Sequence, residues 1–284
     1  IYRREKRLRT ISSRITVSAV TGISGGIYLA VMYMQPTVLG NIGLSDLVMR
    51  LSGSRAPGFP LTPVISELLS LTLVLVPCYV FQIYMGIEVY RSFCTASIYV
   101  FSRTPRRIRW YLGEITALAG AALLFQVILV VSASAAAALM HPFYIDKAGV
   151  VLAVYHIILY TFWLFAMSLI INLLAVYLGS NAAFFVVCGA QLVFTSLLIF
   201  INMFEENRPF VTRFLNLNPM AHLVIGWHSS VVPMLDKTVQ APYEGLYFAV
   251  SFLVTAGTAL AAAVAGAFIV KHHDFLTADP EGGV

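Results

Sequence analysis

Charge is the property that this sequence has least of. Only 11% of its 284 residues are Asp, Glu, Lys or Arg, whereas a soluble domain carries about 25%. The few charges gather in short stretches, and long runs between them carry none. This pattern excludes an ordinary soluble domain and predicts a polytopic membrane protein.

Other absences narrow the chemistry. Cysteine occurs only as Cys78, Cys94 and Cys188, an odd count that predicts neither a disulfide framework nor a metal site. The sequence has no Gly-Lys pair and therefore no P-loop, and it has no His-Glu-x-x-His motif. We therefore expect no catalytic residue, no metal site and no cofactor bound by this chain.

Six apolar segments are long enough to cross a membrane, which takes about 20 residues. We predict spans at about 15–34, 68–87, 110–140, 149–177, 182–204 and 245–270. The fourth and fifth spans share one run, Ala148–Phe204, that contains no Asp, Glu, Lys or Arg, and Gly179, Ser180 and Asn181 supply the break between them. The expected fold is all-α, a single transmembrane domain over 1–284 whose residues 271–284 form a flexible cytoplasmic tail.

The distribution of basic residues predicts the orientation. With six spans, both termini lie on one side, and twelve of the 18 Lys and Arg residues fall on that side. Because cytoplasmic loops are enriched in Lys and Arg, we expect cytoplasmic termini in the cell (plasma or inner) membrane. The net charge of +5 then reflects orientation, and no nucleic-acid partner is expected.

The densest positive charge lies in FSRTPRRIRWYLGE, residues 101–114. By itself this cluster fits a topology determinant, with Trp110 as an interfacial anchor. Thr104 and Pro105 predict a helix start, which puts Arg106 and Arg107 in the first turn. Cations there oppose the helix dipole, so lipid phosphates or an acidic partner explain them better.

A short amphipathic helix is predicted just before this cluster. Tyr90, Cys94, Ile98 and Phe101 recur at spacings of four, four and three residues and form one apolar stripe. Such a helix between two spans lies on the membrane or inserts into the groove of a partner.

The stretch EVYRSFCTASIYVFSRTPRRIRWYLGE, residues 88–114, resembles the cytoplasmic loop of type-2 ABC exporter permeases. In that family a short coupling helix is followed by a Thr-Pro or similar dipeptide, a basic pair and an aromatic-aliphatic run that opens the third span. The positions that follow this pattern are Ser102, Thr104, Pro105, Arg106, Arg107, Trp110, Leu112 and Gly113. The chain departs from the family in having Ser92-Phe93 after Arg91, where Gly-Thr is frequent, and Glu114 in place of a usual Lys.

The resemblance implies a permease subunit that exports an amphipathic or hydrophobic substrate such as a peptide, lipid or drug. ATP and Mg would bind to a separate ABC ATPase subunit, and a second permease subunit, identical or related, would complete the transporter within the membrane lipid. The residues implied in ATPase coupling are Glu88, Tyr90, Arg91, Ile98, Phe101, Arg103, Thr104, Pro105, Arg106 and Arg107. The alternative is an ATP-independent membrane carrier or a membrane-embedded interaction or assembly protein.

A second stretch, FLNLNPMAHLVIGWHSS at residues 214–230, is too short and too broken by polar residues to cross the bilayer. We expect a re-entrant or interfacial helical hairpin there, between spans five and six. The stretch resembles the external segment of the same family, in which Asn-Pro precedes a short apolar helix. The resemblance implies an external gate formed by Asn218, Pro219, His222 and Trp227.

Polar residues inside the expected spans are few and mostly neutral: Gln82, Gln126, His156, Asn172 and Gln191. Such residues are functional candidates by default, but they also form hydrogen bonds between helices, which we favour here. Gln126, His156 and Gln191 remain possible pathway residues. Glu88 and Glu114 lie at the cytoplasmic ends of spans next to arginines, and we expect both to form ion pairs.

Overall fold

The computed structural model describes residues 2–33, 41–53, 64–99, 107–198, 208–230, 232–239 and 245–272. In this part of the chain, six helices are long and apolar enough to cross a membrane. They include α1 (Tyr2–Tyr33), α3 (Val64–Met85), α5 (Arg107–Met140), α6 (Lys147–Leu178), α7 (Ser180–Leu197) and α10 (Phe248–His272). The second candidate span, Leu71–Cys94, continues past the end of α3 into the next helix. The predicted multi-pass, mainly helical membrane protein with six candidate spans is confirmed.

Two of these helices are longer than the apolar layer of a membrane is thick. Helix α5 has 34 residues and α6 has 32, which at about 1.5 Å per residue makes each about 50 Å long. The hydrocarbon core of a bilayer is only about 30 Å thick. Hydrophobicity located both helices and, to within three residues, their ends, whereas α1 begins at Tyr2, 13 residues before its predicted span.

The predicted break between the fourth and fifth spans is confirmed. Helix α6 ends at Leu178 and α7 begins at Ser180, so that Gly179 alone separates them. Gly179 has φ of +79°, a backbone conformation that only glycine adopts without strain. This one residue ends α6 and lets α7 pack beside it.

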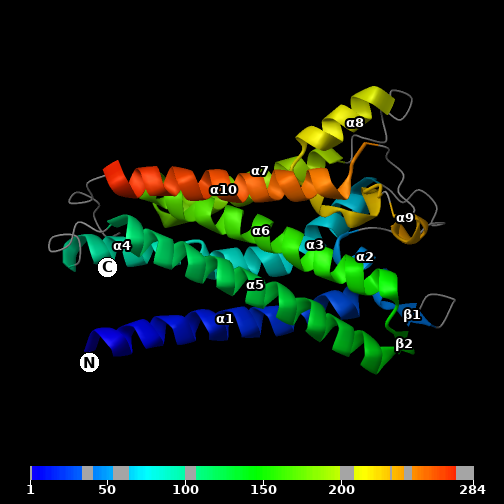
Figure 1. Cartoon of the computed structure of the whole chain (residues 1–284), viewed down its shortest axis with the longest axis horizontal. Helices are drawn as coiled ribbons and strands as arrows, with labels where there is room; N and C mark the ends of the chain where they lie inside the picture. Colours follow the sequence, from blue (N-terminus) through cyan, green and yellow to red (C-terminus); the bar gives the residue numbers. More distant parts are fainter. Residues whose placement is uncertain are drawn as a thin grey trace.

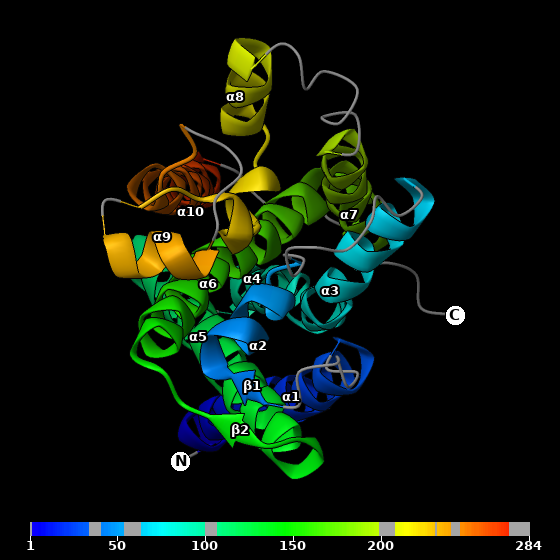
Figure 2. The ribbon, with the colours of Figure 1, turned by 90° about the vertical axis from the view of Figure 1, so that its right-hand side faces the viewer.

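The two ends of the bundle carry different short elements. The start of α1, the short helix α4 (Glu88–Tyr99) and the end of α10 lie at one end (Figure 1). The opposite end carries strand β1 (Ile42–Gly43), helix α2 (Leu44–Leu51), strand β2 (Phe143–Tyr144) and helix α9 (Pro233–Val239) (Figure 1). Helix α8 (Arg208–Leu217) also lies at that opposite end and projects away from the bundle (Figure 2).

The mainly helical fold also contains one short strand pair, β1 and β2, that the sequence did not predict. These two-residue strands pair in parallel, with Ile42 opposite Phe143, and the Ile42 N–H also donates to the Pro142 carbonyl at 2.9 Å. A pair this short has no alternating pattern to reveal it. It is created by the meeting of two segments about a hundred residues apart, which composition does not encode.

Asp146 joins the same two segments by capping two helices at once. Its carboxylate accepts the N–H of Gly149 at 2.9 Å at the start of α6, and that of Ser45 at 3.0 Å at the start of α2. Burial alone would raise the pKa of Asp146, but these hydrogen bonds outweigh it and hold the pKa below its ordinary value. The loop 141–146 is thereby fixed to α2.

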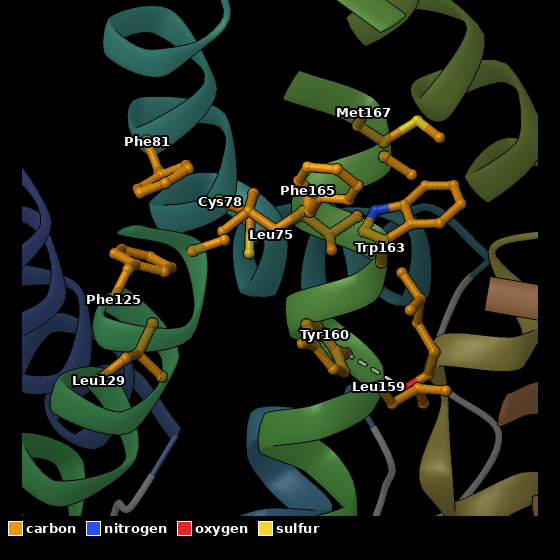
Figure 3. Close-up of a cluster of buried hydrophobic side chains, with 14 of the residues drawn as sticks. Leu75, Cys78, Phe81, Phe125, Leu129, Leu159, Tyr160, Trp163, Phe165 and Met167 are labelled. Atoms are coloured by element: carbon orange, nitrogen blue, oxygen red, sulfur yellow. Dashed lines mark hydrogen bonds between the residues drawn. The ribbon is translucent and has the colours of Figure 1, made fainter. Parts of the chain in front are cut away.

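Helix α6 runs through the middle of the bundle, with the other long helices around it (Figure 2). The interior is filled by large side chains, including Phe81 of α3 and Phe125 of α5, whose ring centroids are 4.9 Å apart (Figure 3). Trp163 of α6 is buried in the same cluster (Figure 3). The centre of this single chain is therefore a packed core.

Helix α1 lies against α5 with their backbones in close approach. A Cβ atom on Gly22 would lie 3.0 Å from the Phe125 carbonyl oxygen, and one on Gly26 would collide with the Leu129 carbonyl. The Ser132 hydroxyl donates to the Gly22 carbonyl at 3.2 Å. Small residues that let two helices touch in this way are typical of packing inside membranes.

The outer faces of the bundle are apolar. On α7 the side chain of Phe185 is 73% exposed, and on α10 those of Leu260 and Phe268 are 67% and 66% exposed. Rows of exposed large apolar side chains would be costly in water, but they suit helices surrounded by lipid.

Candidate functional site

At the α4 end of the bundle, one arginine holds three helices together. The Arg14 guanidinium of α1 donates from Nε to Glu88 Oε1 at 2.9 Å, and from Nη2 to Glu114 Oε2. Glu88 is the first residue of α4, and Glu114 lies in the first turns of α5. The two carboxylates are 74 and 100 residues from Arg14 in the sequence.

Arg14 is 6% exposed, whereas the carboxylates are about one-fifth to one-quarter exposed. A guanidinium buried to this extent needs its charge paired, and two carboxylates supply more than one negative charge. Glu88 at the first position of α4 also favours that helix through its dipole. The triad is therefore a buried connection that ties the start of α4 to α1 and α5.

Glu88 and Glu114 form ion pairs, as expected, and both pair with Arg14 of α1, which is distant from them in sequence. Sequence reasoning did not select Arg14 as a site residue. The signal was present, because Arg14, Glu88 and Glu114 each stand at the border of an apolar run expected to face the same side.

Asn172 of α6 fixes the turn between α3 and α4. Its Nδ2 donates to the Met85 carbonyl at 3.0 Å, and its Oδ1 accepts the Tyr90 N–H at 2.9 Å. Asn172 is 2% exposed. One buried amide therefore satisfies the end of α3 and the beginning of α4, and holds both against α6.

The face that α4 turns to the bundle differs from the predicted stripe. Val89 and Phe93 are buried, and Phe93 packs on Trp110 of α5 with ring centroids 5.6 Å apart. Tyr90 and Cys94 are only half-buried. Trp110 thus contacts α4 in addition to any interfacial role.

The remaining predicted coupling residues divide into two groups. Arg91 is exposed on α4, and Arg107 is half-buried at the first residue of α5. The side chain of Ile98 and the whole of Phe101, Arg103, Thr104, Pro105 and Arg106 lie outside the described residues.

In the middle of the bundle, the polar residues mostly bond to one another. Gln191 Nε2 of α7 donates to Gln82 Oε1 of α3 at 3.0 Å, and the Cys188 thiol contacts the same oxygen at 3.6 Å. This buried amide pair joins α3 to α7, which agrees with the preferred interpretation of these residues as helix-to-helix contacts.

Gln126 and His156 are less fully satisfied. Gln126 Nε2 lies 3.9 Å from Cys78 Sγ, while its Oε1 has no hydrogen-bond partner among the described residues. His156 stacks on Tyr160 with centroids 4.1 Å apart, and its Nδ1 likewise lacks a partner there. Both side chains are buried, so a role for them in a pathway stays a prediction.

At the opposite end, the segment after α8 does not confirm the expected helical hairpin. Residues 221–223 and 225–227 form two 3-10 turns, η2 (Ala221–Leu223) and η3 (Ile225–Trp227). Asn218 explains the difference, because its Oδ1 accepts the Met220 N–H at 2.9 Å and its Nδ2 donates to the Phe194 carbonyl at 2.8 Å. These bonds favour a turn that is fixed to α7.

Of the other predicted gate residues, Pro219 and Trp227 are half-buried and His222 is fully buried. His222 Nδ1 lies 2.8 Å from the Ser251 hydroxyl of α10, which His228 also contacts. Burial lowers the pKa of His222, and it lowers that of His228 to about 4. Sequence reasoning did not select His228 or Ser251 as site residues, and nothing in the local pattern marks the serine.

No protein-family model, no curated protein and no solved structure matches this chain.

Proposed function

We propose that this chain is the transmembrane subunit of a type-2 ABC exporter. The proposal is supported by six candidate spans, by a short helix between the second and third of them, and by the resemblance of residues 88–114 to that family. Its expected cargo is amphipathic or hydrophobic, such as a peptide, lipid or drug.

The observation that carries the proposal is the Arg14 triad. Because Arg14 pairs with Glu88 at the start of α4 and with Glu114 of α5, a displacement of α4 is resisted by charges buried between α1 and α5. Breaking a buried ion pair is unfavourable, so α4 moves together with both long helices. Force applied to α4 by an ATPase would thereby reach the spans.

The transport path belongs between two subunits in this proposal. The centre of one chain is filled by side chains such as Phe81, Phe125 and Trp163 (Figure 3). A second permease subunit, identical or related, supplies the other wall. The end that carries Asn218 and His222 is then external, and the end that carries α4 receives the ATPase, which binds ATP and Mg.

The test is to replace Ile98 and Phe101 together by Asp and to purify the tagged chain from its native membranes. Charges in the proposed docking face should abolish co-purification of a subunit that contains a P-loop and hydrolyses ATP. The matched control is Leu217→Asp, since Leu217 is 82% exposed on α8 at the opposite end.

An ATPase that co-purifies equally with the double variant and the control would contradict the docking assignment. If no ATPase accompanies the unmodified chain, the alternative of an ATP-independent carrier or membrane-embedded assembly protein replaces the proposal.

A further inference from the structure

Two buried histidines share one serine hydroxyl at the end of the bundle opposite α4. His222 Nδ1 lies 2.8 Å from Ser251 Oγ, and His228 Nε2 contacts the same oxygen from the other side. All three side chains are 0% exposed. Their hydrogen bonds must therefore be completed within the protein.

The far nitrogen of each ring faces a backbone carbonyl oxygen. His222 Nε2 lies 3.1 Å from the Asn216 carbonyl oxygen, and His228 Nδ1 lies 3.0 Å from the Val224 carbonyl oxygen. A carbonyl only accepts, so the tautomers that complete these two contacts carry a hydrogen on each of these nitrogens. In a neutral ring the other nitrogen is then an acceptor, and both of those acceptors face Ser251.

Ser251 has a single hydroxyl hydrogen and cannot donate to two acceptors. When both rings are neutral, the serine hydrogen can be donated to only one of them. The near nitrogen of the other ring then faces the serine oxygen with no hydrogen between the two atoms. If either ring adopts its other tautomer, its near nitrogen donates to Ser251, but its far nitrogen then faces a backbone carbonyl oxygen with no hydrogen between them. One additional proton resolves it, because one ring then donates to Ser251 while Ser251 donates to the other ring.

We propose that His222, Ser251 and His228 form a binding site for one proton, which the two rings share. The inference depends only on these contacts and holds whether or not the chain is an exporter. The site joins α10 to the segment 218–228, since Ser251 belongs to α10 and both histidines belong to that segment. A bound proton therefore strengthens the attachment of α10 at this end.

The groups around the two rings determine how many protons the site binds and whether it binds them as the pH rises or falls. From α6, Tyr155 lies 6.2 Å from His228 between ring centroids and its hydroxyl is also hydrogen-bonded to the Ser251 side chain. Because Tyr155 donates its one hydroxyl hydrogen to the Phe248 carbonyl, it supplies no hydrogen to Ser251. Tyr160 donates to the Leu223 carbonyl. Arg213 of α8 and Tyr247 before α10 are exposed, and the side chains of Asp236 and Lys237 in α9 lie outside the described residues.

Among the residues that the structure describes, neither ring pairs with a carboxylate. Burial lowers the pKa of both histidines, and each ring disfavours a second positive charge on the other. The site is therefore empty at neutral pH and takes up its one proton as the pH falls.

The experiment measures deuterium exchange at the histidine ring C2–H, by mass spectrometry on the purified full chain, as a function of pH. In the unmodified protein we expect His222 and His228 to titrate with one shared midpoint below about 6.5, the ordinary value. The pair should take up one proton and not two. Two independent midpoints and two protons above about pH 4 would overturn the proposal.

The variant His228→Gln tests the proposal by the direction in which the midpoint of His222 moves. The glutamine amide can donate or accept, so one hydroxyl hydrogen completes the network and the extra proton is no longer needed. We expect the midpoint of His222 to fall by about one pH unit. If the two rings were independent, removing a neighbouring cation would leave that midpoint unchanged or raise it, and either result would overturn the proposal.

His222→Asn provides the reciprocal measurement, because an Asn amide replaces Nδ1 as Gln replaces Nε2. The midpoint of His228 should fall in the same way, so the test survives if one of the variants does not fold. The matched control is His272→Gln, an exposed histidine at the other end of α10, which should leave both midpoints unchanged.

Discussion

Arg14 and Asp146 each connect parts of the chain that lie far apart in sequence. Arg14 joins α1 to α4 and α5, and Asp146 caps α6 and α2 together. In a chain with so few charges, a single side chain of this kind carries an interaction that no neighbour can replace.

Replacing Arg14 by Gln should destabilise the protein by about 2 kcal/mol, because Glu88 and Glu114 are left close together without a cation. The measurement is the thermal midpoint of the purified chain in lipid nanodiscs. The combined change R14Q, E88Q and E114Q should recover most of the loss, since it removes the uncompensated charges. Arg109→Gln, at an exposed position nearby, serves as the control. Equal midpoints for Arg14→Gln and this control would contradict the role of the triad.

Asp146→Ala should cost about 2 kcal/mol, because both capping hydrogen bonds are lost. The folded pKa of Asp146 lies below its ordinary value, so its contribution is complete above about pH 4 and disappears as the pH falls through the folded pKa. The difference in thermal midpoint between the variant and the unmodified chain should therefore shrink in acid. A difference in thermal midpoint that is the same at neutral and acidic pH would contradict this account. The control variant is Lys147→Ala, because Lys147 is the exposed neighbour of Asp146.

At the scale of elements, contact between α1 and α5 depends on glycine. A methyl group on Gly26 would meet the Leu129 carbonyl of the backbone, which cannot rotate away as a side chain can. We expect Gly26→Ala to lower stability by about 2 kcal/mol, measured as the thermal midpoint. Gly257 of α10 is the matched control, because a Cβ there meets nothing within 4 Å. Gly257→Ala should be neutral or slightly stabilising, since alanine favours a helix. A loss in the control as large as that in Gly26→Ala would contradict the packing argument.

The long elements were predictable from sequence, and the short ones were only partly so. Long apolar runs located all six candidate spans, and Gly179 located the break between α6 and α7. The β1–β2 pair and the 3-10 turns after Asn218 were missed, because the strands pair distant segments and Asn218 combines a local bond to Met220 with one to the distant Phe194. Local patterns such as apolar periodicity carry no signal for such contacts.

For the whole molecule, the two ends of the bundle have different chemistry. One end concentrates a buried ionic triad beneath α4, and the other concentrates neutral histidines between α10 and the segment 218–228. The first site involves residues that the sequence marked, Glu88 and Glu114, although Arg14 was not selected. At the second site, sequence reasoning selected only His222. Ser251 is brought to the histidines by folding and belongs to no sequence motif, so it could not be predicted.

The most direct test of the exporter proposal is site-specific photocrosslinking in native membranes. A benzophenone amino acid replaces Arg91, which is exposed on α4, or Leu217, which is exposed on α8 at the opposite end. The account predicts that position 91 crosslinks to a subunit with a P-loop and that position 217 does not. Absence of such a crosslink at position 91, or equal crosslinking at both positions, would contradict the assignment of α4 as the helix that receives force from an ATPase.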